Sequence, residues 1–173
     1  MDLKTLQKLS YGMYIVSAHK GEKLNGQIAN TMFQITADPP AIAVSINKQN
    51  LTHEYILASN SFAVSIITTE ATMPFIGIFG FKSGRDTDKF KDCNFRTGVT
   101  GNPIIHNYCL GFVEAEVTGS LDCGTHTVFL GKIADAGIFD DKEPMTYAYY
   151  HQVKGGKTQK NAPTYIPPEP KKG

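Results

Sequence analysis

Apolar and polar residues alternate along much of the chain, and this pattern predicts a protein built mainly of β-strands. Aromatic and β-branched residues are concentrated in short runs that Gly, Pro, Asn or Asp residues bound on either side. The four earlier runs cover residues 11–18, 26–36, 41–47 and 61–68. Two longer runs between Ile104 and Phe139 meet at Asp122-Cys123-Gly124, which is typical of a hairpin turn. Since no regular strand–helix alternation is present, the pattern predicts an antiparallel, closed or partly closed barrel.

Three short helices are expected beside the strands. Apolar residues recur every third position in residues 1–10, which indicates the first helix. Asn50 is a candidate N-cap for a second helix over residues 51–59, and residues 71–81 form the third. The Asp38-Pro39-Pro40 sequence is expected to interrupt the strands on either side, because proline cannot donate to a strand ladder.

Composition describes a near-neutral chain of ordinary size. The 173 residues include 17 Lys and Arg against 16 Asp and Glu, which gives a formal net charge of +1. Such a balance disfavours broad binding to nucleic acid or to an anionic membrane surface. No apolar run reaches the roughly 20 residues that cross a bilayer, and the N-terminal stretch lacks the apolar segment of a signal peptide. We therefore expect a cytoplasmic protein.

One folded domain is expected over residues 1–153, followed by a basic, proline-rich tail over residues 154–173. The composition of the tail favours extended or poorly ordered backbone, so we expect it to pack little by itself. Cys93, Cys109 and Cys123 form no C-x-x-C pair, which argues against a disulfide framework and against a zinc or iron site held by paired cysteines. No metal site is predicted.

The usual motifs of hydrolases, zinc proteases and nucleotide-binding folds are absent, so candidate chemistry rests on polar residues at the ends of predicted strands. The best candidate is residues 45–56, where a strand ends and a helix begins near Leu51. The free amides of a first helical turn, the Thr52 hydroxyl and the Lys48 ammonium are suited to hold a phosphate monoester. The alternative is that Asn50 only caps the helix and Lys48 is solvated.

Three further segments carry candidate polar groups. Small and amide-bearing residues over 26–40 suit a strand whose backbone approaches a flavin ring and bonds its edge, although an ordinary strand with a polar face explains the same composition. Residues 80–90 either wrap a cofactor or form a surface loop. His126 lies near the start of a predicted strand, where it either binds a nicotinamide group or serves as a structural histidine.

Six segments, in the same order along the chain, carry a resemblance to a known family. They are SYGMYIV, GQIANTMFQ, SINKQNLTHEYI, FIGIFGFKSG, TGNPII and GTHTVFLGKIADA. With them the chain resembles, nearly end to end, the flavin reductase-like FMN-binding split barrels. Within that family it is similar to archaeal NAD(P)H-dependent ferric reductases and to the flavin domain of high-molecular-weight rubredoxins.

The resemblance implies a mainly β fold, an antiparallel split β-barrel of Greek-key type with a few short helices. It also implies an oxidoreductase that transfers hydride from NADH or NADPH to bound FMN. The residues that it implies for FMN are Gln27, Ile28, Ala29, Asn30, Thr31, Ser45, Ile46, Asn47, Lys48, Leu51, Thr52, Phe81, Lys82, Ser83, Tyr149 and Lys154. Tyr11, Gly12 and His126 are implied on the nicotinamide side, with His126 as the catalytic residue.

Partners are also implied by the resemblance, which points to a homodimer. The electron acceptor is free flavin, ferric iron, or a redox protein such as rubredoxin or a flavodiiron protein. The stretch NAPTYIPPEP is similar to the linker that precedes rubredoxin in fused relatives. Two other functions stay open: an FMN-binding electron carrier that a protein partner reduces, and an interaction barrel without cofactor. The sequence does not separate NADH from NADPH.

Overall fold

The computed structural model describes residues 2–167, which form nine β-strands, three α-helices and one 3₁₀ helix. In chain order these are the 3₁₀ helix Leu3–Lys8, β1 Tyr14–Lys20, β2 Lys23–Ala29, β3 Met32–Ala37, β4 Pro40–Asn47, α1 Leu51–Ser59, β5 Ser61–Ile67, α2 Met73–Phe81, β6 Phe95–Thr97, β7 Pro103–Ile105, β8 Cys109–Cys123, β9 His126–Ile138 and α3 Tyr147–Gln152.

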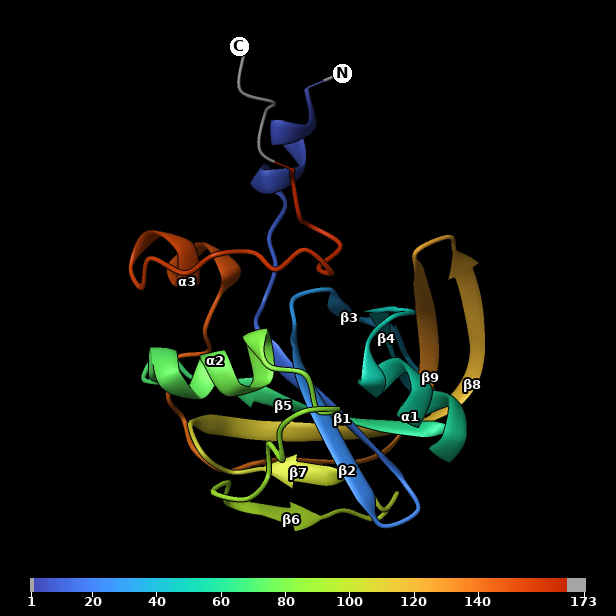
Figure 1. Cartoon of the computed structure of the whole chain (residues 1–173). Coiled ribbons are helices and arrows are strands. Elements are labelled where there is room, and N and C mark those ends of the chain that lie inside the picture. The colour runs from blue at the N-terminus through green and yellow to red at the C-terminus, as the bar shows by residue number, and fades with distance from the viewer. Residues whose placement is uncertain (1, 168–173) are drawn as a thin grey trace.

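Seven strands form one antiparallel sheet in the order β2-β1-β5-β8-β9-β4-β3, and β6 pairs with β7 beside it. The sheet curls around its core without closing, since β2 and β3 are its two edges (Figure 1). Helix α1 packs against β1 and β2, and α2 packs against β2. The prediction of a mainly β, antiparallel split barrel with few helices is therefore confirmed.

The segment predicted as one strand over residues 26–36 is two strands. Strand β2 ends at Ala29 and pairs with β1, whereas β3 begins at Met32 and pairs with β4. The linking pair Asn30 and Thr31 turns the chain from one sheet edge to the other, and the Thr31 carbonyl accepts a hydrogen bond from the Ser45 amide at 3.0 Å. Residues 27–37 contain no Gly or Pro to mark a break, so the composition of the segment does not reveal the change of partner.

The Asp38-Pro39-Pro40 sequence separates two strands as expected, and it does so in a tight turn. Pro40 is the first residue of β4 and pairs with Ala37 at the edge of the sheet. This is a position where proline is tolerated, because the ladder does not need its missing amide.

The long hairpin predicted around Asp122-Cys123-Gly124 is present as β8 and β9. Gly124 has a φ of 76°, the left-handed conformation that a tight turn requires and that glycine adopts most easily. Strand β9 also pairs with β4, in a register that sets His126 opposite Asn47. The hairpin thus places the candidate histidine beside the end of β4.

Two buried clusters form most of the core. The first lies inside the curled sheet and includes Phe62, Phe129 and Ile56, the last from α1. The second lies under α2 and α3 and includes Phe79 and Tyr150. Helix α3 is absent from the sequence-based prediction, because it spans only six residues and its sequence, YAYYHQ, resembles a strand as much as a helix.

Helices α1 and α2 agree with the sequence-based prediction to within two residues. Asn50 holds the N-cap position of α1, yet its side chain makes no bond to the first turn. Instead its Oδ1 accepts a hydrogen bond from Asn161 Nδ2 at 3.0 Å. Within residues 2–167, no helix is both long and apolar enough to span a bilayer.

The tail differs from its expectation, because residues 154–167 return across the open side of the barrel (Figure 1). Lys154 Nζ donates to the Ala71 carbonyl at 2.9 Å, and Asn30 Nδ2 donates to Thr164 Oγ1 at 2.8 Å. Basic and proline-rich composition does not reveal such pairings, which depend on single amide and hydroxyl groups. The domain boundary at residue 153 stays a prediction, and residues 168–173 of the tail lie outside the described part.

Replacing Phe62 by Ala is expected to destabilise the fold strongly. Phe62 is fully buried in the central strand β5, and truncating a buried Phe costs about 3–5 kcal/mol through lost burial and the cavity left behind. Urea unfolding followed by circular dichroism measures the change. Leu57→Ala is the matched control, since Leu57 is 62% exposed on α1 and should change stability by no more than about 0.5 kcal/mol. Equal losses in the two variants would contradict the assigned core.

Candidate functional site

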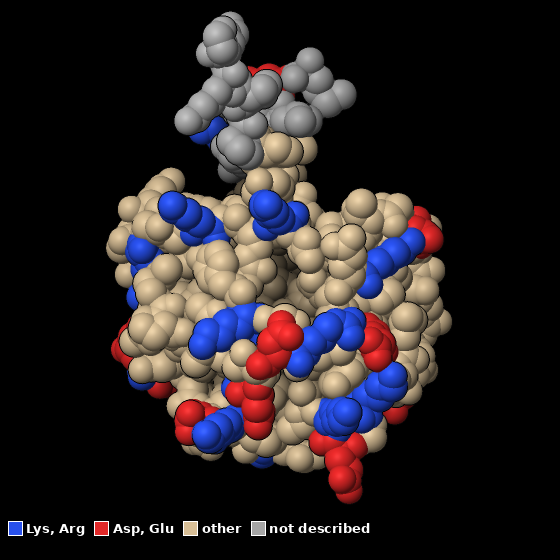
Figure 2. Space-filling model, viewed as in Figure 1, with Lys and Arg blue, Asp and Glu red and all other residues tan. Residues whose placement is uncertain are grey.

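A cleft lies where the tail crosses the open side of the barrel, and this face of the molecule is hollowed at its centre (Figure 2). The cleft has three adjoining compartments, of about 40, 220 and 390 Å³. We call them the central compartment, bordered by residues 27–30 at the end of β2; the helix compartment, at the start of α1; and the hairpin compartment, beside His126. All three share Asn161 or its neighbour Ala162 as a wall.

The central compartment has a polar side and an apolar side. Gln27 of β2 and Asn30, which follows the end of β2, supply side-chain amides, while Met13 and Ile76 supply apolar groups. Gln27 Oε1 is buried and has no hydrogen-bond partner in the structure. Because a buried polar atom without a partner is unfavourable, this oxygen is suited to a ligand group that donates to it.

The helix compartment is lined by amide, hydroxyl and ammonium groups at the N-terminus of α1. Thr52 Oγ1 accepts a hydrogen bond from Asn25 Nδ2 at 2.8 Å, and Ser83 lines the same space. Lys82 and Lys89 both border it, and no Asp or Glu residue is among its described lining residues. The first-turn amides of a helix and two ammonium groups favour a bound anion here.

Lys89 is the most buried of the described lysines of the cleft, with 7% of its surface exposed. Its Nζ donates to the Gly26 carbonyl at 2.8 Å. Burial lowers the pKa of this ammonium to about 8, because low-polarity surroundings disfavour the charged form. Sequence reasoning gave residues 80–90 as a segment that either wraps a cofactor or forms a surface loop, but it did not single out Lys89, because a lysine after a turn with two Asp residues carries no local sign of burial.

In the hairpin compartment, the tail contacts one ring nitrogen of His126, and the neighbouring Thr125 contacts the other. Its Nε2 lies 3.1 Å from the Asn161 carbonyl oxygen, and its Nδ1 lies 2.8 Å from Thr125 Oγ1. A carbonyl oxygen can only accept, so Nε2 carries the proton in this contact and a neutral ring accepts the Thr125 hydroxyl at Nδ1. The ring is thus held with a donor directed toward the cleft.

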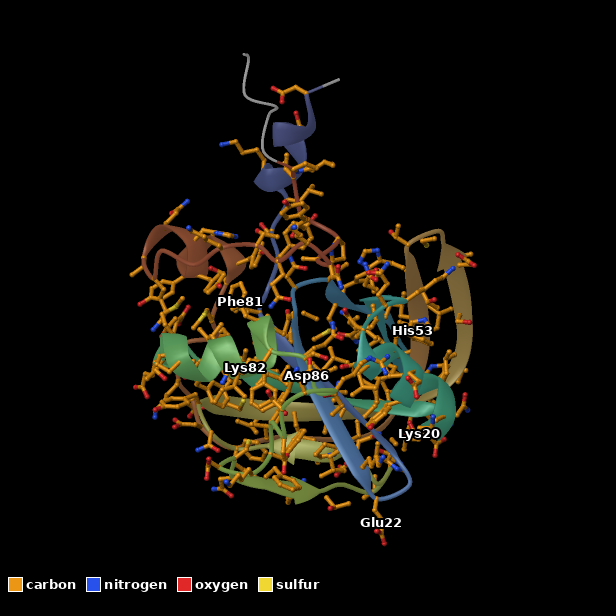
Figure 3. The ribbon with its side chains drawn as sticks, viewed as in Figure 1. Lys20, Glu22, His53, Phe81, Lys82 and Asp86 are labelled. Carbon is orange, nitrogen blue, oxygen red and sulfur yellow. The ribbon has the colours of Figure 1, made fainter. Side chains whose placement is uncertain are left out.

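Twelve of the predicted site residues line the cleft, so the structure brings together segments that are far apart in the sequence. Phe81 and Lys82 follow one another where α2 ends, toward the centre of the molecule (Figure 3). The cleft residues are Gln27, Ile28, Ala29, Asn30, Ser45, Asn47, Leu51, Thr52, Phe81, Lys82, Ser83 and His126.

Three predicted neighbours of these residues lie outside the compartments. Lys48 Nζ lies 2.7 Å from both carboxylate oxygens of Asp122, in an exposed ion pair at the tip of the hairpin. Ile46 points into the core and is fully buried, as expected from strand alternation, because Val44 two positions earlier lies in the same core cluster. Thr31 binds its neighbour through its hydroxyl and supports β4 through its carbonyl.

Four more predicted residues gather around α3 rather than in the compartments. The Tyr11 carbonyl accepts a hydrogen bond from the Tyr147 amide at 2.8 Å, and Gly12 pairs with Thr146 in an isolated bridge. Tyr149 lies in α3 itself, and Lys154 binds Ala71. These four residues lie around α3, the helix that precedes the tail.

Comparison with known proteins assigns the chain to a family. The model of the Flavin reductase like domain family matches residues 6–156. The chain belongs to the flavin reductase-like domain family. It is 53% identical over 165 residues to a high molecular weight rubredoxin of Moorella thermoacetica, covering 95% of this chain and 72% of that protein. It is 43% identical over 166 residues to a ferric-chelate reductase (NAD(P)H) of Archaeoglobus fulgidus, covering 96% and 98%.

A solved structure has a similar fold. An FMN-binding protein from Thermus thermophilus matches this chain with a TM-score of 0.70 and 25% identity, over 78% of this chain and 74% of that one. Together these matches confirm the predicted membership and the prediction of an oxidoreductase.

His53 connects helix α1 to strand β9. Its Nε2 lies 2.8 Å from Thr127 Oγ1, and its ring packs against Phe129 with centroids 5.2 Å apart. Burial, and then the nearby Lys48 charge, lower the pKa of His53, so the folded protein favours the neutral ring.

The protein is expected to lose stability below about pH 6.5, because His53 is protonated more readily in the unfolded chain. Because its pKa is lowered on folding, the unfolded chain binds the proton more readily, and protonation favours unfolding as pH falls through the ordinary histidine value of about 6.5. Urea unfolding from pH 5 to pH 8 measures this, with His53→Gln as the comparison. The free energy of unfolding should fall more steeply with decreasing pH in the wild type than in the variant. If the free energies of unfolding of the wild type and of His53→Gln differed by the same amount at every pH, a neutral buried ring would be contradicted.

Proposed function

We propose that this protein binds FMN in the cleft and catalyses the reduction of an electron acceptor by NADH or NADPH. The observation that carries the proposal is the pairing of an amide-lined central compartment with an adjoining anion-favouring helix compartment. A ring and a terminal phosphate need these two environments side by side. Bound FMN would supply the site with a hydride acceptor and a centre for electron transfer.

On the ring side, β2 would supply the hydrogen bonds. Gln27 and Asn30 offer amide groups, and the backbone of Ile28 and Ala29 lies between them along the same strand. Hydrogen bonds to the ring edge tune how readily a flavin takes up electrons. Phe81, exposed by 57% at the end of α2, would cover the ring from the other side.

On the phosphate side, the start of α1 would hold the anion. The amides of Leu51 and Thr52 have no acceptor within the helix, because first-turn amides lack one. The Thr52 hydroxyl and Ser83 add donors, and Ser45 and Asn47 border the adjoining compartment. This arrangement supports FMN, whose phosphate is terminal.

His126 would position the nicotinamide. Its Nε2 donor now meets the Asn161 carbonyl, and a nicotinamide carboxamide oxygen offers the same kind of acceptor. Tyr11 and Gly12 would border this side through the segment next to α3, and Tyr149 and Lys154 would support the tail that walls the cleft. The ferric-chelate reductase relative is named for NAD(P)H, which supports a nicotinamide donor without separating the two forms.

A redox protein and a second copy of the chain are the partners we propose. The Moorella thermoacetica relative is a rubredoxin by name, which supports rubredoxin or a flavodiiron protein as acceptor, alongside ferric iron or free flavin. Edge strand β3 exposes Phe33 and Ile35 by 54% and 41%, a surface suited to a homodimer that sedimentation velocity would detect. Three free thiols fit a reducing, cytoplasmic compartment.

Mixing the FMN-loaded protein with NADH or NADPH without oxygen is expected to bleach its visible absorbance. His126→Ala should slow this bleaching by about tenfold, because one hydrogen bond to the nicotinamide is lost. Stopped-flow absorbance measures the rate, dithionite checks that the variant still holds reducible flavin, and His106→Ala controls for a histidine outside the cleft. An unchanged spectrum with both nicotinamides would refute the reductase activity, and a normal rate in His126→Ala would favour a carrier without a nicotinamide site.

Truncating the chain after Gly156 is expected to weaken FMN binding by tenfold or more. This removes Gln159 and Asn161, which wall the central and helix compartments. Quenching of flavin fluorescence gives the dissociation constant, which should rise by about that factor if one or two hydrogen bonds and the enclosing wall are lost. A chain ending at Pro167 keeps the wall and is the matched control. Equal affinity of the two truncated forms would remove the tail from the site.

A further inference from the structure

Lys48 is the lysine nearest in sequence to the start of α1, but its ammonium is already paired with a carboxylate. The ammonium of Lys48 is held by both oxygens of Asp122, in an exposed ion pair at the tip of the β8–β9 hairpin. Lys48 lines none of the three compartments of the cleft. The positive charge that a phosphate needs must come from another residue.

Lys89 has the burial and the surroundings that Lys48 lacks. It lines the helix compartment, and within residues 2–167 it forms no ion pair with a carboxylate. A buried ammonium whose only hydrogen-bond acceptor is the Gly26 carbonyl is costly, and a bound anion would offset much of that cost. The other cation of the compartment, Lys82, is exposed.

Asn25 supplies a second, independent observation at the same place. The residue is 3% exposed, and its Oδ1 is buried in the helix compartment without a hydrogen-bond partner. The two ends of an amide are distinguished only by their partners. With the amide reversed, Oδ1 would accept the Thr52 hydroxyl and Nδ2 would donate into the compartment. A bound anion would accept a hydrogen bond from that Nδ2, so both ends of the Asn25 amide would then have a partner.

We propose that Lys89, assisted by Asn25 and the Thr52 hydroxyl, is the residue that neutralises the terminal phosphate of the bound flavin. The inference rests on the proposed function and names the binding group within that site. It predicts that discrimination between FMN and riboflavin, which lacks the phosphate, depends on Lys89 and not on Lys48.

A purely structural role for Lys89 makes a different prediction. Its bond to Gly26 joins the loop after α2 to β2, so losing the side chain could loosen the whole cleft. A loosened cleft would bind FMN and riboflavin equally poorly. Loss of a phosphate contact would affect FMN alone.

The test measures dissociation constants of FMN and riboflavin by flavin fluorescence for the wild type, Lys89→Met, Lys89→Gln and Lys48→Met. The two Lys89 variants should weaken FMN by about tenfold or more and riboflavin by less than about threefold, since a charge-assisted hydrogen bond is lost only with the phosphate. Lys48→Met removes the same charge from an exposed ion pair and should leave both constants within about threefold. Lys89→Gln retains a donor for the Gly26 carbonyl, so a folded variant is available if Lys89→Met does not fold.

Two results would overturn the assignment while leaving the flavin site standing. They are equal losses of FMN and riboflavin in the Lys89 variants, and a selective loss of FMN in Lys48→Met. A wild-type protein that binds neither flavin would instead overturn the proposed function, and the role of Lys89 with it. The wild-type arm thus separates failure of the function from failure of the residue assignment.

Discussion

The change of strand partner at Asn30 and Thr31 is the constraint on which the rest of the site depends. Strand β2, before these residues, pairs with β1, and strand β3, after them, pairs with β4. The curled sheet therefore stays open between β2 and β3. Where two edge strands separate in this way, some backbone amides and carbonyls have no partner in the sheet, and side chains from both edges face the same space. The cleft is therefore a product of topology, and the polar residues that border it are placed by strand pairing rather than by flexible loops.

Local pattern was enough to predict much of the fold. Strand β5, helix α1 and the β8–β9 hairpin depend on period, caps and turn residues that lie within a few positions of one another. The division of residues 26–36 and the return of the tail depend on which distant segment each one meets. Alternation is the same for a strand that keeps its partner and for two strands that exchange it, so the sequence pattern could not distinguish them.

The same division holds in the candidate site. Gln27, Thr52 and His126 were found because they belong to continuous segments that resemble a known family. Lys89 and Asn161 were not, since their roles follow from burial and from contacts across the fold. Lys48 shows the converse: its position beside a helix start suggested an anion ligand, but Asp122, 74 positions away, holds its charge.

Asn161 ties two ends of the cleft with one residue. Its backbone carbonyl accepts a hydrogen bond from His126 Nε2, and its side-chain amide donates to Asn50 at the start of α1. These bonds cannot be broken independently by a movement of the tail, because both belong to the same short stretch of chain. Tension applied to the chain at this residue would act on the hairpin compartment and the helix compartment together, so the two compartments are mechanically coupled through a single asparagine.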